Sequence, residues 1–335
     1  METLNTARQN FTEGHLYGIP ALLKPCLDNG FNKTEKIQAY WLLARTYLFI
    51  DDPISAEDSY LKLLKLDPEY TVDPENDPVE MIYLSQKFKT TPVFVLFGKI
   101  GINASKASPF QNFGVDNTSA SNEAYSYKFG FHIGVGTEWN MSNHFSLGVE
   151  FDLVSRKYAY SNTLFEFDEQ TFEEVQRTIN IPVFVKYRTT WGKMYPFVYL
   201  GINPNRLLEA SADVNLIDKA TSDDESLLEF PVTGPREDLL DQRKKITASL
   251  IAGIGINYRF GYNYIFVDLR YEYGMTNMID INNQYGNDVL LYRYAIVDDD
   301  KRLNSFALSF GYVKPLYKPR KISEKRGLNL KRLFK

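Results

Sequence analysis

Cysteine, histidine and long apolar runs are all scarce in this chain of 335 residues. The single cysteine, Cys26, excludes a disulfide scaffold and any cysteine-based zinc or iron–sulfur site. The three histidines, His15, His132 and His144, lie far apart and form no spaced metal motif, so we expect no metal and no cofactor. No run of about 18 apolar residues occurs, which excludes a transmembrane helix. Residues 1–14 lack the apolar stretch of a signal peptide. If the protein is exported, we expect this numbering to describe the mature, processed chain.

A net charge of −4 hides an asymmetry along the chain. Residues 314–335 hold nine Lys or Arg against Glu324 alone, a local charge of +8 that leaves −12 for the rest. We expect residues 318–335 to form a basic tail that pairs with acidic partners or lipid headgroups, or is simply solvated. Its basic residues are Lys318, Arg320, Lys321, Lys325, Arg326, Lys331, Arg332 and Lys335. They lack the interleaved aromatics of a stacking platform, so we predict no nucleic-acid partner.

Apolar residues in the first 90 positions recur at spacings of three and four, which predicts helices. One segment reproduces the skeleton of a tetratricopeptide repeat (TPR) and predicts a partner-binding helical domain. The residues that carry it are Tyr40, Leu43, Ala44, Tyr47, Ala56, Tyr60 and Pro68. Asp52-Pro53 and Asp67-Pro68 predict helix breaks, and 19–27 and 79–88 predict flanking helices. Two helical pairs are fewer than a repeat array needs, so the domain should be stabilised by packing against the rest of the chain or a partner. The alternative is a plain helical cap without a binding role.

From residue 91 the apolar pattern changes to strict alternation, which predicts strands. In the third alternating stretch, Phe151 and Leu153 lie on one face while Glu150 and Asp152 lie on the other. The pattern gives eight stretches, and the facing of the first and fifth stays open. They are 93–105, 125–135, 145–153, 179–187, 195–207, 246–258, 265–273 and 306–312.

A soluble lipocalin-like barrel and a transmembrane barrel share this alternation with opposite polarity. Three observations favour the membrane barrel. Short connections near 140–143, 189–194 and 261–263 alternate with long ones at 107–123, 160–173, 208–243 and 276–302, as in outer-membrane proteins. Glycines share the polar face with opposite charges, which suits a narrow barrel interior. Aromatic residues mark the strand ends, as in interfacial girdles. These are Tyr125, Tyr127, Trp139, Tyr158, Tyr187, Trp191, Tyr195, Tyr258, Tyr264, Tyr273 and Tyr312.

Eight strands make a barrel only wide enough for its own side chains, so a solute conduit is not expected. The inward-facing charges nearly balance and predict an internal ion-pair network. They are Lys99, Lys128, Glu138, Glu150, Asp152, Lys186, Arg188, Arg259, Asp268, Arg270 and Glu272.

The glycine–aromatic alternation of 129–136 and 309–312, together with the strand number and loop pattern, resembles the PorT-like outer-membrane β-barrel family of Bacteroidota. The resemblance covers residues 92–316. It implies an integral outer-membrane protein with a role in assembly or secretion, type 9 secretion included. The helical domain ahead of the barrel and the chain beyond its last strand depart from that family.

These patterns together predict an α+β multidomain chain. It has a TPR-like domain at 1–90, an eight-stranded antiparallel transmembrane β-barrel at 91–317 and the basic tail at 318–335. Short turns face the periplasm in such barrels, which places the helical domain and the tail there. The acidic loop at 208–243 and the carboxylates at 298–300 would then face the cell exterior as solvated groups. The loop lacks the order of an EF-hand, so Ca²⁺ binding is the lesser alternative.

The leading functional prediction is a non-enzymatic barrel whose helical domain docks other envelope proteins, as a subunit or accessory of a secretion, transport or assembly complex. Expected partners are those proteins, outer-membrane lipid and lipopolysaccharide. One alternative is a small pore or a surface ligand receptor that uses the long acidic loops. Another is an outer-membrane lipid enzyme, although His132 faces inward, His144 lies at a turn and no G-x-S-x-G elbow occurs.

Overall fold

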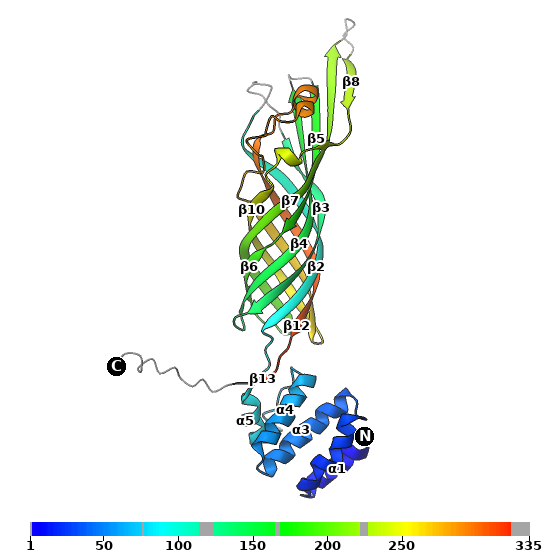
Figure 1. Cartoon of the computed structure of the whole chain (residues 1–335), viewed down its shortest axis with the longest axis vertical. Coiled ribbons are helices and arrows are strands. Elements are labelled where there is room, and N and C mark those ends of the chain that lie inside the picture. Colours follow the sequence, from blue (N-terminus) through cyan, green and yellow to red (C-terminus); the bar gives the residue numbers. More distant parts are fainter. Residues whose placement is uncertain (1, 76, 114–123, 165–167, 222–226, 323–335) are drawn as a thin grey trace, which may run out of the picture. The chain divides into compact units, whose positions relative to one another are not determined.

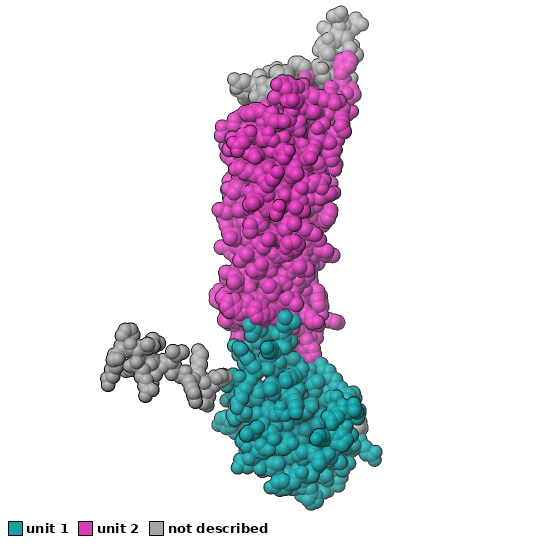
Figure 2. Space-filling view, viewed as in Figure 1, with its two compact units in different colours: residues 1–93, 316–335 teal, residues 94–315 magenta. Residues whose placement is uncertain are grey.

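The computed structural model describes residues 2–75, 77–113, 124–164, 168–221 and 227–322. The chain forms two compact units, residues 1–93 with 316–335 and residues 94–315 (Figure 2). The basic residues Lys325, Arg326, Lys331, Arg332 and Lys335 lie outside the described residues. Within the described residues, no helix combines the length and apolarity needed to span a membrane.

The described residues of the first unit form five α-helices, which appear in blue to cyan in Figure 1. They are α1 (Glu2–Thr12), α2 (Ile19–Asp28), α3 (Lys33–Phe49), α4 (Pro53–Leu66) and α5 (Val79–Gln86). Asn32 starts α3 through a reciprocal capping box with Glu35, and the Asp52 side chain caps α4 ahead of Pro53. The expected helix breaks therefore coincide with the observed ends of α3 and α4. The pattern did not single out α1, whose buried residues are only Leu4 and Ala7.

Two apolar clusters hold these helices together, and all residues of the repeat pattern except Pro68 lie in one or both of them. Ala44 and Ala56 are fully buried in the cluster between α3 and α4, together with Tyr60. Tyr40 and Tyr47 pack against this cluster and also against the one formed by α1, α2 and α3. Small residues thus lie where helices approach, and large residues fill the space between pairs.

A short two-stranded sheet ties the start of the tail to the helices. Strand β1 (Phe88–Lys89) pairs antiparallel with β13 (Arg320–Lys321). Glu57 of α4 forms ion pairs with Lys321 at 2.5 Å and Lys87 at 3.0 Å. Hydrogen bonds, first from Lys321 and then from Lys87, lower the pKa of Glu57 against an opposing effect of burial. Part of the basic tail is therefore occupied within its own unit, and Lys318 remains exposed.

In the second unit, the residues that the structure describes form one antiparallel sheet of eleven strands that closes on itself. The order β2-β3-β4-β5-β7-β10-β11-β12 returns to β2, and β6 continues the position of β5 because both pair with β4 and β7. The strands are β2 (Phe94–Gln111), β3 (Ala124–Asn140), β4 (Phe145–Leu164), β5 (Asp168–Asn180), β6 (Val183–Arg188), β7 (Met194–Thr221), β8 (Leu227–Thr233), β9 (Glu237–Asp238), β10 (Ile246–Phe260), β11 (Asn263–Gly274) and β12 (Asp300–Leu316).

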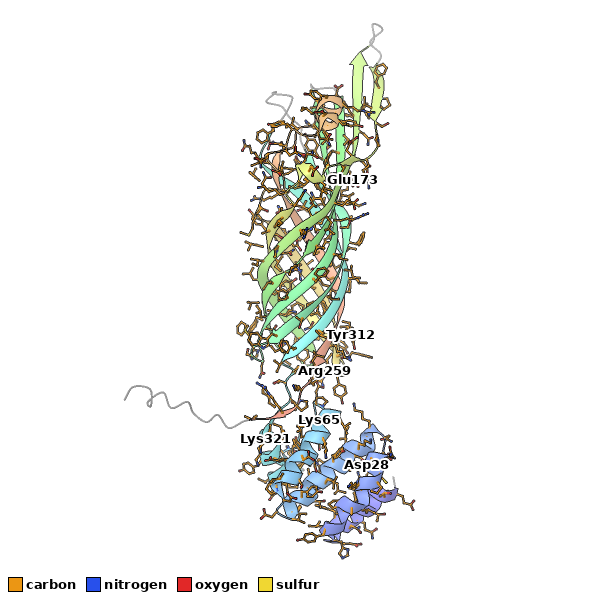
Figure 3. All side chains as sticks on the ribbon, viewed as in Figure 1. Asp28, Lys65, Glu173, Arg259, Tyr312 and Lys321 are labelled. Atoms are coloured by element: carbon orange, nitrogen blue, oxygen red, sulfur yellow. The ribbon has the colours of Figure 1, made fainter. Side chains whose placement is uncertain are left out.

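The outer face of this sheet is apolar and the inner face is polar. Phe131, Ile133 and Val135 are each more than half exposed, whereas the intervening His132 is buried. Tyr312, labelled in Figure 3, is exposed on the same outer face of β12. The structure also shows which residues of the first and fifth alternating stretches face outward. Ile100 of β2 and Leu200 of β7 are exposed, while their neighbours Lys99 and Tyr199 are buried. Since apolar side chains cover the outside, the sheet has the polarity of a membrane barrel.

Several connections expected to be loops are strands instead. The segment 160–173 is largely the hairpin of β4 and β5, and β7 runs on to Thr221, where it pairs with β8. Sequence alternation did not reveal these extensions, because their outward residues, such as Ser161 and Glu173, are polar. The last connection, 275–299, contains the short helix η3 (Val289–Arg293) and buries Leu290 and Tyr294.

Candidate functional site

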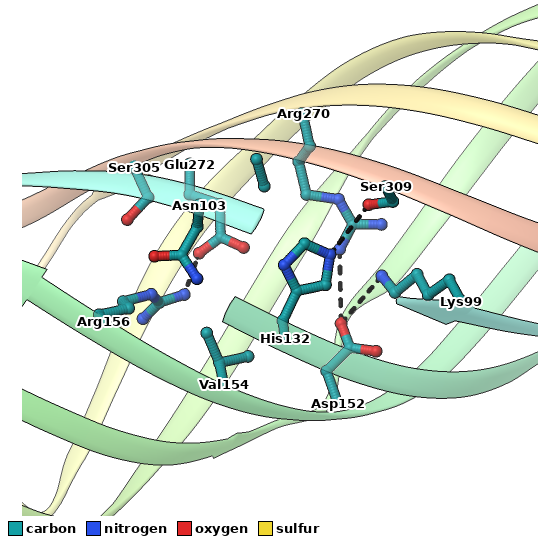
Figure 4. A pocket seen from close by; sticks show the side chains of 11 residues that line it. Lys99, Asn103, His132, Asp152, Val154, Arg156, Arg270, Glu272, Ser305 and Ser309 are labelled. Carbon is teal, nitrogen blue, oxygen red and sulfur yellow. Dashed lines mark hydrogen bonds and ion pairs between the residues drawn. The ribbon is translucent and has the colours of Figure 1, made fainter. Parts of the chain in front are cut away.

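The centre of the barrel lumen holds a cluster of buried ion pairs (Figure 4). Lys99 Nζ lies 2.5 Å from Glu150 and 3.0 Å from Asp152. Arg270 lies 2.8 Å from the same Glu150 and 3.7 Å from Asp152. All four side chains are less than 5% exposed, so each charge is compensated inside the barrel and not by water.

Further pairs extend this network along the lumen. The Tyr199 hydroxyl donates to Asp268 at 2.8 Å and accepts from Arg270 at 2.8 Å. Arg156 pairs with Glu272, and Lys186 pairs with Glu138. The lumen is thus filled by paired charges of both signs.

His132 lies within the central cluster and lines a small cavity. One ring nitrogen, Nε2, lies 3.0 Å from Ser309 Oγ. The cavity has a volume of about 10 Å³, with Asp152 and Arg156 also in its wall. That space matches roughly one water molecule, so the His132–Ser309 pair has no room for a substrate.

Towards the short turns the lumen is closed by aromatic rings that lie over glycines. A Cβ atom on Gly136 would meet the Phe97 ring at 2.4 Å, and one on Gly148 would meet the Phe184 ring at 2.3 Å. Phe197 lies in the same way against Gly255. These rings belong to one buried apolar cluster, so the inward glycines make room for an aromatic plug.

At the opposite end, the last connection packs into the barrel mouth. Arg243 is 1% exposed and pairs with Glu174 of β5 and Asp298 of this connection, both at 2.6 Å. Lys301 also pairs with Asp298 at 2.6 Å. Although burial opposes ionisation, Arg243 and Lys301 hold the pKa of Asp298 well below its usual range. We call this group, Glu174, Arg243, Asp298 and Lys301, the mouth cluster.

The buried mouth cluster corrects one expectation and adds residues that the sequence did not reveal. Residues 298–300 are less than a tenth exposed and are not solvated. Tyr158, expected at a membrane interface, is 1% exposed and donates to Glu174. Arg243 lies outside every alternating stretch, and Arg156 lies just past the end of the third, so neither was expected in the lumen.

The structure brings most of the predicted inward charges together, and places three elsewhere. Lys128 is 42% exposed and pairs with Glu173, because a bulge between Lys128 and Phe131 shifts the register of β3 against β4. Arg188 and Arg259 lie at strand ends, where they donate to the carbonyls of Asn143 and Gly261. The buried members are Lys99, Glu138, Glu150, Asp152, Lys186, Asp268, Arg270 and Glu272.

The outer face of the sheet carries an open polar groove of about 430 Å³. It crosses β3, β4, β5 and β7 beyond the apolar surface, with Ser126, Ser161 and Thr171 as exposed hydroxyl residues in its wall. The Lys128–Glu173 and Arg236–Asp213 pairs border it. In the described part of the chain, no group of three His, Cys, Asp or Glu residues has the arrangement of a metal site.

Comparison with solved structures finds other membrane barrels at low similarity. Neisserial surface protein A is 13% identical, with 66% of this chain and 97% of that chain covered and a TM-score of 0.29. Outer membrane protein W of Escherichia coli is 10% identical, with 68% and 98% covered and a TM-score of 0.30. The N-terminal barrel of OprF from Pseudomonas aeruginosa is 11% identical, with 67% and 99% covered and a TM-score of 0.21. No curated protein matches the chain.

The family described as the outer membrane protein beta-barrel domain matches residues 94–280, which is more than half of the chain. The match begins at the first residue of β2 and runs past the end of β11, so it covers most of the apolar exterior and most of the charged lumen described above. The chain therefore belongs to the outer membrane protein β-barrel domain family, and its barrel is an outer-membrane barrel.

Proposed function

We propose that the chain is a non-enzymatic outer-membrane anchor. Its eight-stranded barrel has a closed lumen and carries a TPR-like helical domain that docks other envelope proteins. The observation that carries the proposal is the closure of the lumen at three levels, by the mouth cluster, the central ion pairs and the aromatic plug. A barrel filled in this way offers no path for a solute, so its function has to lie on its surfaces or in the helical unit.

The helical unit carries an aromatic and basic face that suits such docking. Arg45 of α3 lies between the rings of Phe11 and Trp41, at 4.9 and 4.4 Å from their centroids. Phe49, which is 61% exposed, packs edge-on against Phe11. Among the described residues, no carboxylate forms an ion pair with Arg45. This face therefore fits a partner segment that offers acidic and apolar groups.

The periplasm is the proposed compartment for this docking. The helical domain (1–90) precedes β2 in the chain, and the tail (318–335) follows β12. The start of β2 and the end of β12 both lie at the end of the sheet that carries the short turns. In outer-membrane barrels the short turns face the periplasm. The resemblance to the PorT-like family of Bacteroidota extends the proposal to a secretion, transport or assembly complex, with type 9 secretion as one candidate.

Site-specific photocrosslinking in native membranes tests the docking proposal. A crosslinker at Phe49 should capture envelope proteins, whereas one at Tyr292, which is 80% exposed in the last connection, should not capture the same proteins. Arg45→Glu should abolish the capture. Lys24→Glu makes the same change of charge at an exposed position of α2 and should leave capture intact. A chain that yields no crosslinked partner and purifies alone would contradict the proposal.

The polar groove on β3, β4, β5 and β7 favours a second candidate function, a surface receptor for a hydrophilic ligand. Its volume of about 430 Å³ lies within the range of small-molecule sites, and its wall offers hydroxyl, amide and carboxylate groups. Lipopolysaccharide sugars are one such ligand. Replacing Ser161 and Thr171 by bulky residues should then abolish binding of labelled saccharide without changing the crosslinks from Phe49.

A further inference from the structure

The short-turn end of the barrel carries charge of one sign. The strand ends and turns at 139–147, 187–196, 257–265 and 313–317 contain Arg188, Lys193, Arg259 and Lys314 but no Asp or Glu. Register places these segments at one level, because Trp139 pairs with Leu147, Tyr195 with Asn257 and Tyr264 with Val313. We call these segments the basic rim.

Exposed aromatic residues lie in the same segments and form the border of the apolar exterior at the short-turn end of the barrel. Trp191 is 76% exposed and Phe260 is 72% exposed. Figure 3 labels Tyr312 and Arg259 at this end of the barrel. The other exposed aromatic residues of the rim are Trp139, Phe145, Tyr187 and Tyr258. Aromatic side chains of this kind mark the level of the lipid headgroups in membrane barrels.

Two lysines of the rim are exposed and take no carboxylate partner among the described residues. Lys193 lies in the turn between β6 and β7, and Lys314 lies two residues after the outward-facing Tyr312. The opposite end of the barrel differs, because several of its outward bases are paired with carboxylates. Arg177 bonds to Glu209, Arg236 to Asp213 and Lys128 to Glu173. Carboxylates thus accompany these outward bases at the opposite end, whereas the basic rim contains no carboxylate.

We propose that the basic rim binds the phosphate-bearing headgroups of anionic phospholipids. Lys193 and Lys314 supply ammonium groups at headgroup height, and the adjacent aromatic side chains hold that height against the apolar layer. A base near an anionic membrane surface strengthens association about fivefold. This proposal rests on the outer-membrane family assignment and is independent of partner docking by the helical domain.

Reconstitution of the full-length protein in vesicles tests the rim. One set of vesicles contains phosphatidylcholine alone, and the other contains phosphatidylcholine with phosphatidylglycerol. Native mass spectrometry of protein released from the mixed vesicles should show retained phosphatidylglycerol. Lys193→Gln combined with Lys314→Gln should reduce that retention by about fivefold for each base. Arg177→Gln combined with Lys245→Gln removes the same charge from exposed positions at the other end and should leave retention unchanged.

Three outcomes would overturn the proposal. Retention of phosphatidylglycerol by the rim variant equal to that of the unaltered chain would remove the role of the lysines. An equal loss in the control variant would show an effect of net charge and not of the rim. Inorganic phosphate that displaces the lipid at equal phosphate concentration would make the rim a site for free phosphate and not for headgroups.

Discussion

Arg243 offers the sharpest test of the closed barrel mouth. Its guanidinium donates from Nε to Glu174 at 2.9 Å and from Nη1 to Asp298 at 2.6 Å, and its side chain is 1% exposed. Arg243→Met keeps the apolar stem and removes the charge. Two buried carboxylates then lose their main partner, although Glu174 keeps the Tyr158 hydroxyl and Asp298 keeps Lys301. Breaking a buried pair by removing one partner costs about 3–5 kcal/mol, and the remaining bonds favour the lower end.

A double-mutant cycle separates this loss from general damage. Glu174→Gln alone should also destabilise the barrel, but it should cost little in the Arg243→Met background because the unpaired charge is then gone. Urea unfolding in vesicles gives the free energies. Amide exchange at Ile296, whose N–H donates to the Leu290 carbonyl, reports opening of the last connection itself. A cost below about 1 kcal/mol for Arg243→Met, or an equal cost of Glu174→Gln in both backgrounds, would refute the reasoning.

Three further predictions follow from single contacts. The pKa of Asp298 is lowered in the folded chain. The ionised Asp298 should therefore contribute fully to stability above its ordinary pKa of about 3.8, and this contribution should be lost as pH falls below that value. Amide exchange of the last connection, measured against pH, tests this. Gly148→Ala should block folding, measured by heat-modifiable electrophoretic mobility, because its Cβ would meet the Phe184 ring; Phe184→Ala should relieve the clash. Asn32→Ala should destabilise the helical unit by about 1 kcal/mol through loss of the capping box, measured by thermal circular dichroism.

Alternation in the sequence predicted the two faces of the strands wherever the outside is apolar. Phe151 and Leu153 are exposed while Glu150 and Asp152 are buried, because a period of two assigns whole sets of residues to opposite faces. The same pattern stopped at Leu153, since the next two positions of the same sequence parity, Ser155 and Lys157, are polar. Arg156 was therefore not predicted to lie in the lumen, although it continues the inward-facing series of Glu150 and Asp152 in the same strand.

The mouth cluster could not have been predicted from local sequence. Glu174, Arg243 and Asp298 are separated by more than 50 residues each, and only the closure of the sheet and the fold of the last connection bring them together. The misplacement of Lys128 has a different cause. One bulge in β3 shifts its register, and a one-residue shift exchanges the two faces of a strand. Long-range closure and local irregularity thus account for the residues that were missed.

The charged lumen follows from what the outside of the barrel requires. Ion pairs buried in a protein are rarely more stabilising than a packed apolar core, so stability alone does not explain why Lys99, Glu150 and Arg270 occupy the centre. An apolar lumen would make every strand apolar on both faces, because lipid already demands apolar side chains outside. Such strands would read as continuous apolar runs of high β-propensity, which aggregate when exposed. Alternation with charges keeps each strand polar on one side until the sheet closes, and pairing then satisfies those charges inside.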